Sequence, residues 1–163
     1  KDRLMTAMTI RKYTNADIPR LKEITEICFD TVSIDQNIEM HFGLVGGKNW
    51  QWRKSRHIDA DTKPEHGEGI FVCEIAGKVC GYITTRIDRE ASIGSIPNIA
   101  VMPMHQGKGI GSKLIVTAIE YMRDNSVECM RIETLEQNSI GKHLYPKFGF
   151  REIAHQVHYA MRL

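Results

Sequence analysis

The segment HQGKGIGS, residues 105–112, decides the fold, because it lies between an apolar, strand-like run and an amphipathic helix. Glycine has no Cβ, so backbone N–H groups in such a loop can approach a ligand closely. The following helix begins at about Gly109, and its N-terminus adds unpaired N–H donors and a partial positive charge. Lys108 can add a further positive charge at the rim. The segment therefore predicts a site for a phosphate or pyrophosphate group.

Two familiar phosphate-binding motifs do not fit this loop. A dinucleotide fingerprint places a third glycine three residues after the second, where this chain has Ser112. A P-loop needs Gly-Lys followed by Ser or Thr after a four-residue gap from an earlier glycine, and this order does not occur here. Other segments of the chain must therefore identify the ligand.

Hydrophobic periodicity predicts a mixed α/β order along the chain. The region 30–64 gives a weaker signal, helical in pieces and interrupted at Gly46-Gly47. Pro97 has no N–H to donate, so its strand should be bulged or irregular. The predicted elements are a strand at 9–14, a helix from Asn15 or Asp17 to Phe29, strands at 70–75, 79–87 and 95–102, a helix at 109–124, a strand at 127–134, a short helix at 139–147 and a closing strand at 150–161.

A second segment, NSIGKHLYPKFGF at residues 138–150, follows the loop about 30 residues later. Together, the two segments resemble the GNAT superfamily of acetyltransferases. The loop from Gln106 to Gly111 matches that family's acetyl-CoA pyrophosphate motif, Q/R-x-x-G-x-G/A. Residues 138–150 match N-x-x-A-x-x-L-Y-x-K-x-G-F at every fixed place except Gly141, where Ala is usual.

The resemblance covers residues 9–161, nearly the whole chain, and implies the GNAT fold, which is a mixed α/β (α+β) architecture. We expect a mostly antiparallel, twisted sheet flanked by helices on both faces. Its two central strands, 95–102 and 127–134, would splay apart to form a cleft for acetyl-CoA.

In this family a substrate amine attacks the acetyl thioester directly, within a ternary complex, so acetyl-CoA is the implied co-substrate. The backbone N–H of Val101, or of its immediate neighbour, would donate to the developing oxyanion. Tyr145 occupies the family's general-acid position, with a packing role as the alternative. Asn138 would bond the pantetheine arm or cap the following helix. The implied acetyl-CoA contacts are Ile99, Ala100, Val101, Gln106, Gly107, Lys108, Gly109, Ile110, Gly111, Ser112, Asn138 and Tyr145.

The acceptor amine must lose a proton, because an alkylammonium with a pKa of about 10 has no lone pair at neutral pH. Some relatives place a Glu early on the bulged strand, where this chain has no acidic residue. Glu133 could act as the base, directly or through water, and His57 is a second candidate. An ion pair of Glu133 with Arg131 or Arg86 is the alternative. A water relay, or an amine that arrives neutral, also stays open.

Acceptor recognition in the family comes mainly from the first two helices and the loops near the cleft. Here the run KNWQWRKSRH, residues 48–57, combines aromatic and cationic side chains. On a helix, either Trp50, Lys54 and His57 or Arg53 and His57 would share a face. The aromatic and cationic side chains could bind an anionic group, such as a carboxylate, on a small amine. A solvated helix face with tryptophan anchored in the core is the alternative. The positive charge argues against a polyamine or aminoglycoside acceptor at this wall.

Length and charge bound the remaining possibilities. The 163 residues carry a formal net charge of +2, which fits one domain and gives no electrostatic case for a nucleic-acid partner. We expect a single domain at 9–163, preceded by an extension of residues 1–8 that was added in cloning or ends at a natural start, Met5 or Met8. The apolar runs fall short of the roughly 18 residues that span a bilayer, so we expect no membrane partner.

Cysteine and histidine usage point to a cytoplasmic protein without a metal. The four cysteines are widely spaced and form no C-x-x-C pair, which favours reduced thiols over disulfides or a zinc site. The histidines are scattered without a metal-ligand spacing.

The leading functional prediction is an acetyl-CoA-dependent N-acetyltransferase that acts on a primary amine of a small molecule. One alternative is an N-acetyltransferase of a protein N-terminus or lysine, and another is a non-catalytic acyl-CoA-binding sensor. Homodimer formation through sheet edges or the last strand, with residues 155–159 contributing, stays open.

Overall fold

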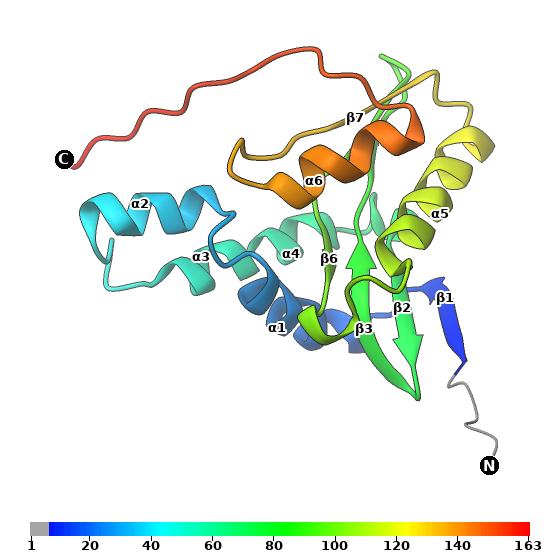
Figure 1. Ribbon diagram of the computed structural model, residues 1–163, viewed down its shortest axis with the longest axis horizontal. Helices are drawn as coiled ribbons and strands as arrows, with labels where there is room; N and C mark the ends of the chain where they lie inside the picture. Colours follow the sequence, from blue (N-terminus) through cyan, green and yellow to red (C-terminus); the bar gives the residue numbers. More distant parts are fainter. Residues whose placement is uncertain (1–6) are drawn as a thin grey trace.

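The computed structural model describes residues 7–163 (Figure 1). Its strands are β1 (Met8–Lys12), β2 (Phe71–Ile75), β3 (Lys78–Ile83), β4 (Arg86–Asp88), β5 (Ile93–Ile96), β6 (Ile99–Val101) and β7 (Cys129–Ile132). Its helices are α1 (Ile18–Cys28), α2 (Ile34–Phe42), α3 (Trp50–Ser55), α4 (His57–Asp61), α5 (Ile110–Asp124) and α6 (Ser139–Leu144). Short 3₁₀ turns are η1 (Asn15–Asp17), η2 (Gly67–Gly69), η3 (Pro103–His105) and η4 (Tyr145–Phe148). Most of the extension expected at residues 1–8 lies outside the described residues, and Met8 already belongs to β1.

The strands form two sheets, and helices cover both faces of the larger one, as predicted (Figure 1). The first sheet has the order β1-β2-β3-β6 and is antiparallel throughout. The second has the order β4-β5-β7, in which β5 pairs with β7 in parallel. Strand side chains alternate between faces: Val72 and Tyr82 pack with α1, whereas Cys73 and Ile83 pack with α5.

The predicted irregularity at Pro97 is confirmed, and it determines where the sheet divides. The expected strand at 95–102 is interrupted at Pro97 and Asn98, which separate β5 from β6. Before the break, Ile96 of β5 pairs with Ile132 of β7. After the break, β6 pairs only with β3 on its other side, so β6 and β7 separate as the predicted central strands were expected to do.

The region between the first helix and the sheet is helical in pieces, in agreement with the sequence pattern. Asn49 caps α3, because its side-chain oxygen accepts from the N–H of Trp52 at 2.9 Å. Gly43, Gly46 and Gly47 all have positive φ and break the chain between α2 and α3. No helix in the part of the chain that the structure describes is long and apolar enough to cross a membrane.

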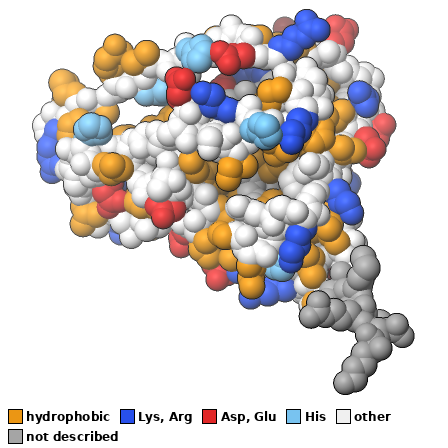
Figure 2. Space-filling model, viewed as in Figure 1, with side chains coloured by type: hydrophobic (Ala, Val, Ile, Leu, Met, Phe, Trp, Pro, Cys, Tyr) orange, Lys and Arg blue, Asp and Glu red, His pale blue; other side chains and the backbone are white. Residues whose placement is uncertain are grey.

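The closing strand predicted at 150–161 is wrong. Residues 150–163 are extended but belong to neither sheet, and they run from α6 across to α2 (Figure 1). A strand needs a ladder partner, and after Gly149 (φ +96°) the chain leaves β7 behind. The Arg162 guanidinium anchors the far end, donating to the carbonyl of Phe42 at 2.6 Å. Figure 2, in the same view, shows exposed hydrophobic side chains at the upper left of the molecule, where this segment runs.

Candidate active site

The glycine loop has the backbone geometry of an anion site. Gly107 (φ +77°) and Gly109 (φ +80°) are both left-handed, and a Cβ at either position would meet no atom within 4 Å. Gly109 is the N-cap of α5 and provides no side chain to bond the first turn. The N–H of Lys113 is the first to bond back into the helix, to the carbonyl of Gly109 at 3.1 Å. The earlier N–H groups, of residues 110–112, therefore remain available to a ligand.

The loop is held rigidly by its neighbours. Ile110, Leu114 and Ile115 of α5 are buried in the core under the first sheet. The side-chain amide of Gln106 donates to the carbonyl of Val101 at 3.1 Å, which ties the loop to β6. Because the donors of the loop are fixed before a ligand binds, binding would cost little ordering of the backbone.

Two backbone N–H groups of β6 point to the edge of the sheet, away from the neighbouring strand β3. Residues opposite one another in an antiparallel pair alternate between bonded and non-bonded positions. Met102 donates to the carbonyl of Cys80 at 2.8 Å, and Thr84 donates to the carbonyl of Asn98 at 2.9 Å. The intervening Ile99 and Val101 therefore occupy non-bonded positions opposite β3, and their N–H groups face the side from which β7 has separated.

Asn138 caps α6. Its side-chain oxygen accepts from the N–H of Gly141 at 3.1 Å, and its amide donates to the hydroxyl of Thr134 at 2.8 Å. A Cβ at Gly141 would lie 2.9 Å from the Asn138 amide, 3.0 Å from the Tyr145 ring and 3.2 Å from the Thr134 hydroxyl. This close packing explains why glycine stands here, where the family motif usually has alanine.

Tyr145 lies where α6, β6 and the loop meet. It packs against the cluster that contains Ile110 and Val101, with the ring of Phe150 edge-on at 6.2 Å. Burial raises the pKa of Tyr145 above its usual value of 10, so the hydroxyl is protonated at neutral pH and can donate a hydrogen bond. A Cβ at Gly111 would lie 3.7 Å from the side chain of Leu144, which shows how closely α6 approaches the loop.

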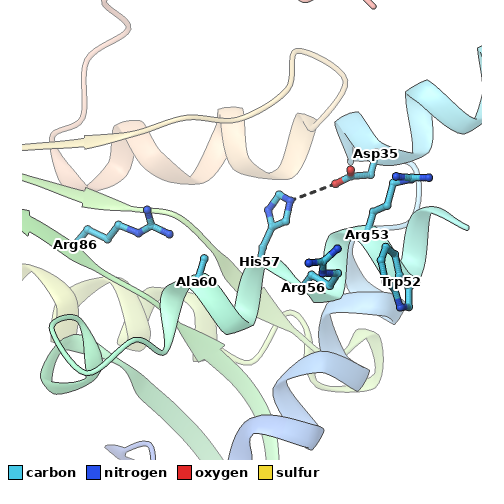
Figure 3. A pocket seen from close by; sticks show the side chains of 7 residues that line it. All are labelled: Asp35, Trp52, Arg53, Arg56, His57, Ala60 and Arg86. Atoms are coloured by element: carbon cyan, nitrogen blue, oxygen red, sulfur yellow. Dashed lines mark ion pairs between the residues drawn. The ribbon is translucent and has the colours of Figure 1, made fainter. Parts of the chain in front are cut away.

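A cavity of about 490 Å³ lies on the opposite side of β6 from the loop's helix, among α2, α3, α4 and β4 (Figure 3). His57 points into it, and its Nε2 lies 3.4 Å from Asp35 Oδ2. Burial, and then the nearby charge of Lys54, lower the pKa of His57 below its ordinary 6.5, while Asp35 opposes them. His57 is therefore neutral at neutral pH. The cavity is lined by Asp35, Trp52, Arg53, Arg56, His57, Ala60 and Arg86.

Of the other two residues predicted to share a face with His57, Trp50 does not line the cavity, whereas the ammonium of Lys54 lies 3.5 Å from His57 Nδ1. Trp50 is buried, and it is Trp52 that lines the cavity. Lys54 donates to the side chain of Asn98 at 2.9 Å, and its ammonium lies 4.2 Å from the centre of the Phe29 ring. The alternative face, with Arg53 and His57, is the one that lines the cavity. Arg56 and Ala60 belong to the same lining.

Glu133 lies just after β7 and forms an exposed ion pair with Arg131 at 2.9 Å, in line with the alternative interpretation. Its side chain is 71% exposed, and it does not line the cavity that holds His57. Among residues 7–163, no group of three or more His, Cys, Asp or Glu side chains is placed to hold a metal.

Sequence reasoning missed a buried polar network behind the cavity. The carboxylate of Asp61, only 1% exposed, accepts hydrogen bonds from the Arg86 guanidinium at 2.8 Å, the Thr84 hydroxyl at 2.9 Å and the Asn98 amide at 2.6 Å. Because Asn98 immediately precedes β6, this network fixes α4 against the strand whose N–H groups are free. Only the unusual burial of an aspartate marks it, and the sequence does not reveal that burial.

Comparisons with known proteins identify the family of this chain. A mycothiol acetyltransferase of Tsukamurella paurometabola is 30% identical over 95 residues, which cover 58% of this chain and 32% of that protein. An N-alpha-acetyltransferase of Sulfolobus acidocaldarius is 30% identical over 106 residues, which cover 58% of this chain and 63% of that protein. The match thus spans less than two thirds of either relative.

Structural likeness extends over most of the chain. A GNAT family acetyltransferase from Brucella melitensis, in complex with acetyl-CoA, has a TM-score of 0.66 and 23% identity over 90% of this chain and 84% of that one. This likeness shows the fold. A model of the Acetyltransferase (GNAT) family matches residues 34–150, which is well over half of the sequence. The chain therefore belongs to the GNAT acetyltransferase family.

Proposed function

We propose that this protein transfers the acetyl group of acetyl-CoA to a primary amine of a small molecule, by direct attack in a ternary complex. The observation that carries the proposal is two sets of free backbone N–H donors, those of Ile99 and Val101 on β6 and those of residues 110–112 at the start of α5. Fixed N–H groups at a helix N-terminus suit a pyrophosphate, and the free edge of β6 suits the amide groups of a pantetheine arm. The available donors therefore match the two polar parts of acetyl-CoA.

The transfer uses four groups of this chain. The amine nitrogen bonds to the acetyl carbon, and the developing oxyanion accepts a hydrogen bond from the N–H of Val101. The C–S bond then breaks, and Tyr145 donates its proton to the departing thiolate. The proton that the attacking amine loses goes to His57, which lies beside both Asp35 and Lys54. Lys108, at the rim of the loop, would add positive charge near the phosphates.

His57 is the preferred base over Glu133. Its imidazole is neutral at neutral pH, and its helix is fixed to the start of β6 through the Asp61 network. The carboxylate of Glu133 instead pairs with Arg131 in solvent and does not line the cavity.

A protein N-terminus is the second candidate acceptor. The specific observation in its favour is the 30% identity to a relative named N-alpha-acetyltransferase. A small molecule also fits the cavity, whose volume of about 490 Å³ falls in the range of roughly 300–1,000 Å³ that drug-sized ligands occupy.

Thiol release from acetyl-CoA, followed with a thiol reagent, separates these candidates. We expect release with free small amines and none above background with peptides that present a free N-terminal Ser or Ala. Release with peptides alone would transfer the proposal to a protein acceptor. Acetyl-CoA binding without release on any amine would favour the non-catalytic sensor.

Homodimer formation and a cytoplasmic location complete the proposal. The exposed residues Ile153, Val157, Tyr159 and Met161 lie along an extended segment, and β7 is an edge strand of its sheet. That segment of one copy could pair with β7 of a second copy. A Val157→Lys, Tyr159→Lys variant should then be monomeric in light scattering where the wild type is dimeric.

Four free thiols, two of them buried, support a reducing compartment.

A further inference from the structure

The cavity beside His57 has more cationic than acidic side chains around it. Three guanidinium groups line it, those of Arg53, Arg56 and Arg86 (Figure 3). Arg86 is paired with Asp61, and the carboxylate of Asp35 faces His57. Across residues 7–163, neither Arg53 nor Arg56 forms an ion pair with an acidic side chain. Two cationic groups in the wall therefore lack a partner.

Arg86 adds a buried donor without an acceptor. Its Nη2 is held by Asp61 at 2.8 Å, whereas its Nε is buried and has no hydrogen-bond partner within the described part of the chain. Buried N–H donors in folded proteins are nearly always bonded. The carboxylate of Asp61 thus fixes the guanidinium in place, while its Nε–H still lacks an acceptor.

The two unpaired guanidinium groups are also held in position. That of Arg56 lies 4.6 Å from the centre of the Trp52 ring, and that of Arg53 donates to the backbone carbonyl of Val45. Stacking and tethering of this kind limit side-chain freedom before a ligand arrives, which lowers the entropic cost of binding. Guanidinium groups bind carboxylates and phosphates through paired, charge-assisted hydrogen bonds.

We propose that the acceptor is an amine that also carries an anionic group, a carboxylate or a phosphate, which the arginines of this cavity bind while the amine faces His57. The inference rests on the proposed acetyl transfer and specifies its substrate class. His57 and Arg56 line the same cavity, so one small molecule can present its amine to His57 and its anionic group to the arginines (Figure 3).

The test compares acceptors that differ only in the anionic group. The pairs are glycine with glycinamide, phenylalanine with phenylalaninamide, and O-phosphoethanolamine with ethanolamine. For each, kcat/KM is measured by thiol release, and binding to the CoA-loaded protein is measured by calorimetry. We expect at least one anionic member to exceed its neutral partner by about tenfold or more, the effect of one charge-assisted hydrogen bond. The carboxylate and phosphate pairs distinguish the two sources of charge.

Variants connect the preference to the cavity. Arg56→Gln and Arg53→Gln should each lower kcat/KM for the anionic acceptor by about tenfold and leave its neutral partner within twofold. Arg89→Gln, in the β4–β5 turn, is the matched control and should change neither. All three variants should bind acetyl-CoA as the wild type does.

The outcomes separate this inference from the proposed transfer. Equal kcat/KM for both members of every pair, or a preference for every neutral member, overturns the anionic acceptor while leaving transfer intact. If no amine is turned over, binding decides: failure of all three anionic members to bind the CoA-loaded protein also overturns it. Failure of acetyl-CoA itself to bind rejects the proposed function instead.

Discussion

The two sides of β6 are built differently. On one side, the loop and the start of α5 offer backbone N–H groups, fixed by glycines such as Gly107 and Gly109. On the other side, the cavity wall consists of side chains from four elements, including Asp35, His57 and Arg86. Backbone donors can serve one common ligand in many sequences, whereas side chains can change from one family member to the next. The comparison suggests that the loop recognises the acyl donor and that the cavity selects the acceptor.

The largest effect is expected at Tyr145, which lies on the donor side. Tyr145→Phe removes the proposed proton donor for the thiolate and should lower kcat by about 10²–10⁴-fold with acetyl-CoA affinity unchanged. Tyr121→Phe is the matched control and should retain activity. Tyr121 is a half-buried residue of α5 whose ring packs edge-on against Phe71. Unchanged kcat in Tyr145→Phe would remove this hydroxyl from the mechanism and leave it a packing role.

The next effect is on stability and concerns the network behind the acceptor wall. Asp61→Asn removes a buried charge that accepts three hydrogen bonds, and should lower the free energy of unfolding by about 3 kcal/mol. Asp59→Asn, on the same helix but exposed and paired with Lys22, should cost less than about 1 kcal/mol. Urea denaturation measures both. Equal losses would show that the network does not fix α4 to β6.

Gly141→Ala tests how closely α6 controls Tyr145. The added methyl group would lie about 3 Å from both Tyr145 and Asn138, and overpacking of this kind typically costs about 1–3 kcal/mol. We expect kcat to fall severalfold with acetyl-CoA affinity less affected, measured by steady-state kinetics and calorimetry. Ser139→Ala, at the first position of the same helix, should be near neutral. An unchanged kcat would mean that the ring position is not critical.

The smallest expected effect is a shift of a pH profile. His57 must be neutral to accept a proton, so kcat/KM should fall as pH decreases through a pKa below 6.5. The imidazole binds a proton less readily in the folded chain than in the unfolded one. Its contribution to stability is therefore complete above pH 6.5 and is lost as pH falls below that value.

Asp35→Asn distinguishes the two candidate bases. Asp35 raises the pKa of His57 against the lowering effects of burial and Lys54, so its removal should shift the acidic limb of kcat/KM to lower pH. Glu133→Gln should leave the limb in place. The opposite pattern, a limb that depends on Glu133 and not on Asp35, would assign the base to Glu133.

The donor side could be predicted from sequence because its residue identities have local causes. The left-handed glycines and the missing N–H of Pro97 determine the backbone conformation at their own positions. The sequence therefore predicts both the loop and the break in the strand. The acceptor wall could not be predicted in the same way. Arg86 arrives from β4, about 30 residues after His57, and the choice between Trp50 and Trp52 depends on how α3 packs. The closing strand failed for a related reason, since residues 150–161 have strand-like side chains but find no ladder partner among residues 7–163.

Calorimetric titration of acetyl-CoA tests the central claim most directly, with two substitutions of matched strain. Gly109→Glu places an anionic side chain among the donors of the loop, and Gly77→Glu places one at the β2–β3 turn, where φ is +75° against +80°. We predict that the wild type and Gly77→Glu bind acetyl-CoA alike, and that Gly109→Glu loses at least about a hundredfold in affinity, as a charge facing a pyrophosphate requires. Equal binding by all three proteins, or none by the wild type, would contradict the assignment of the loop.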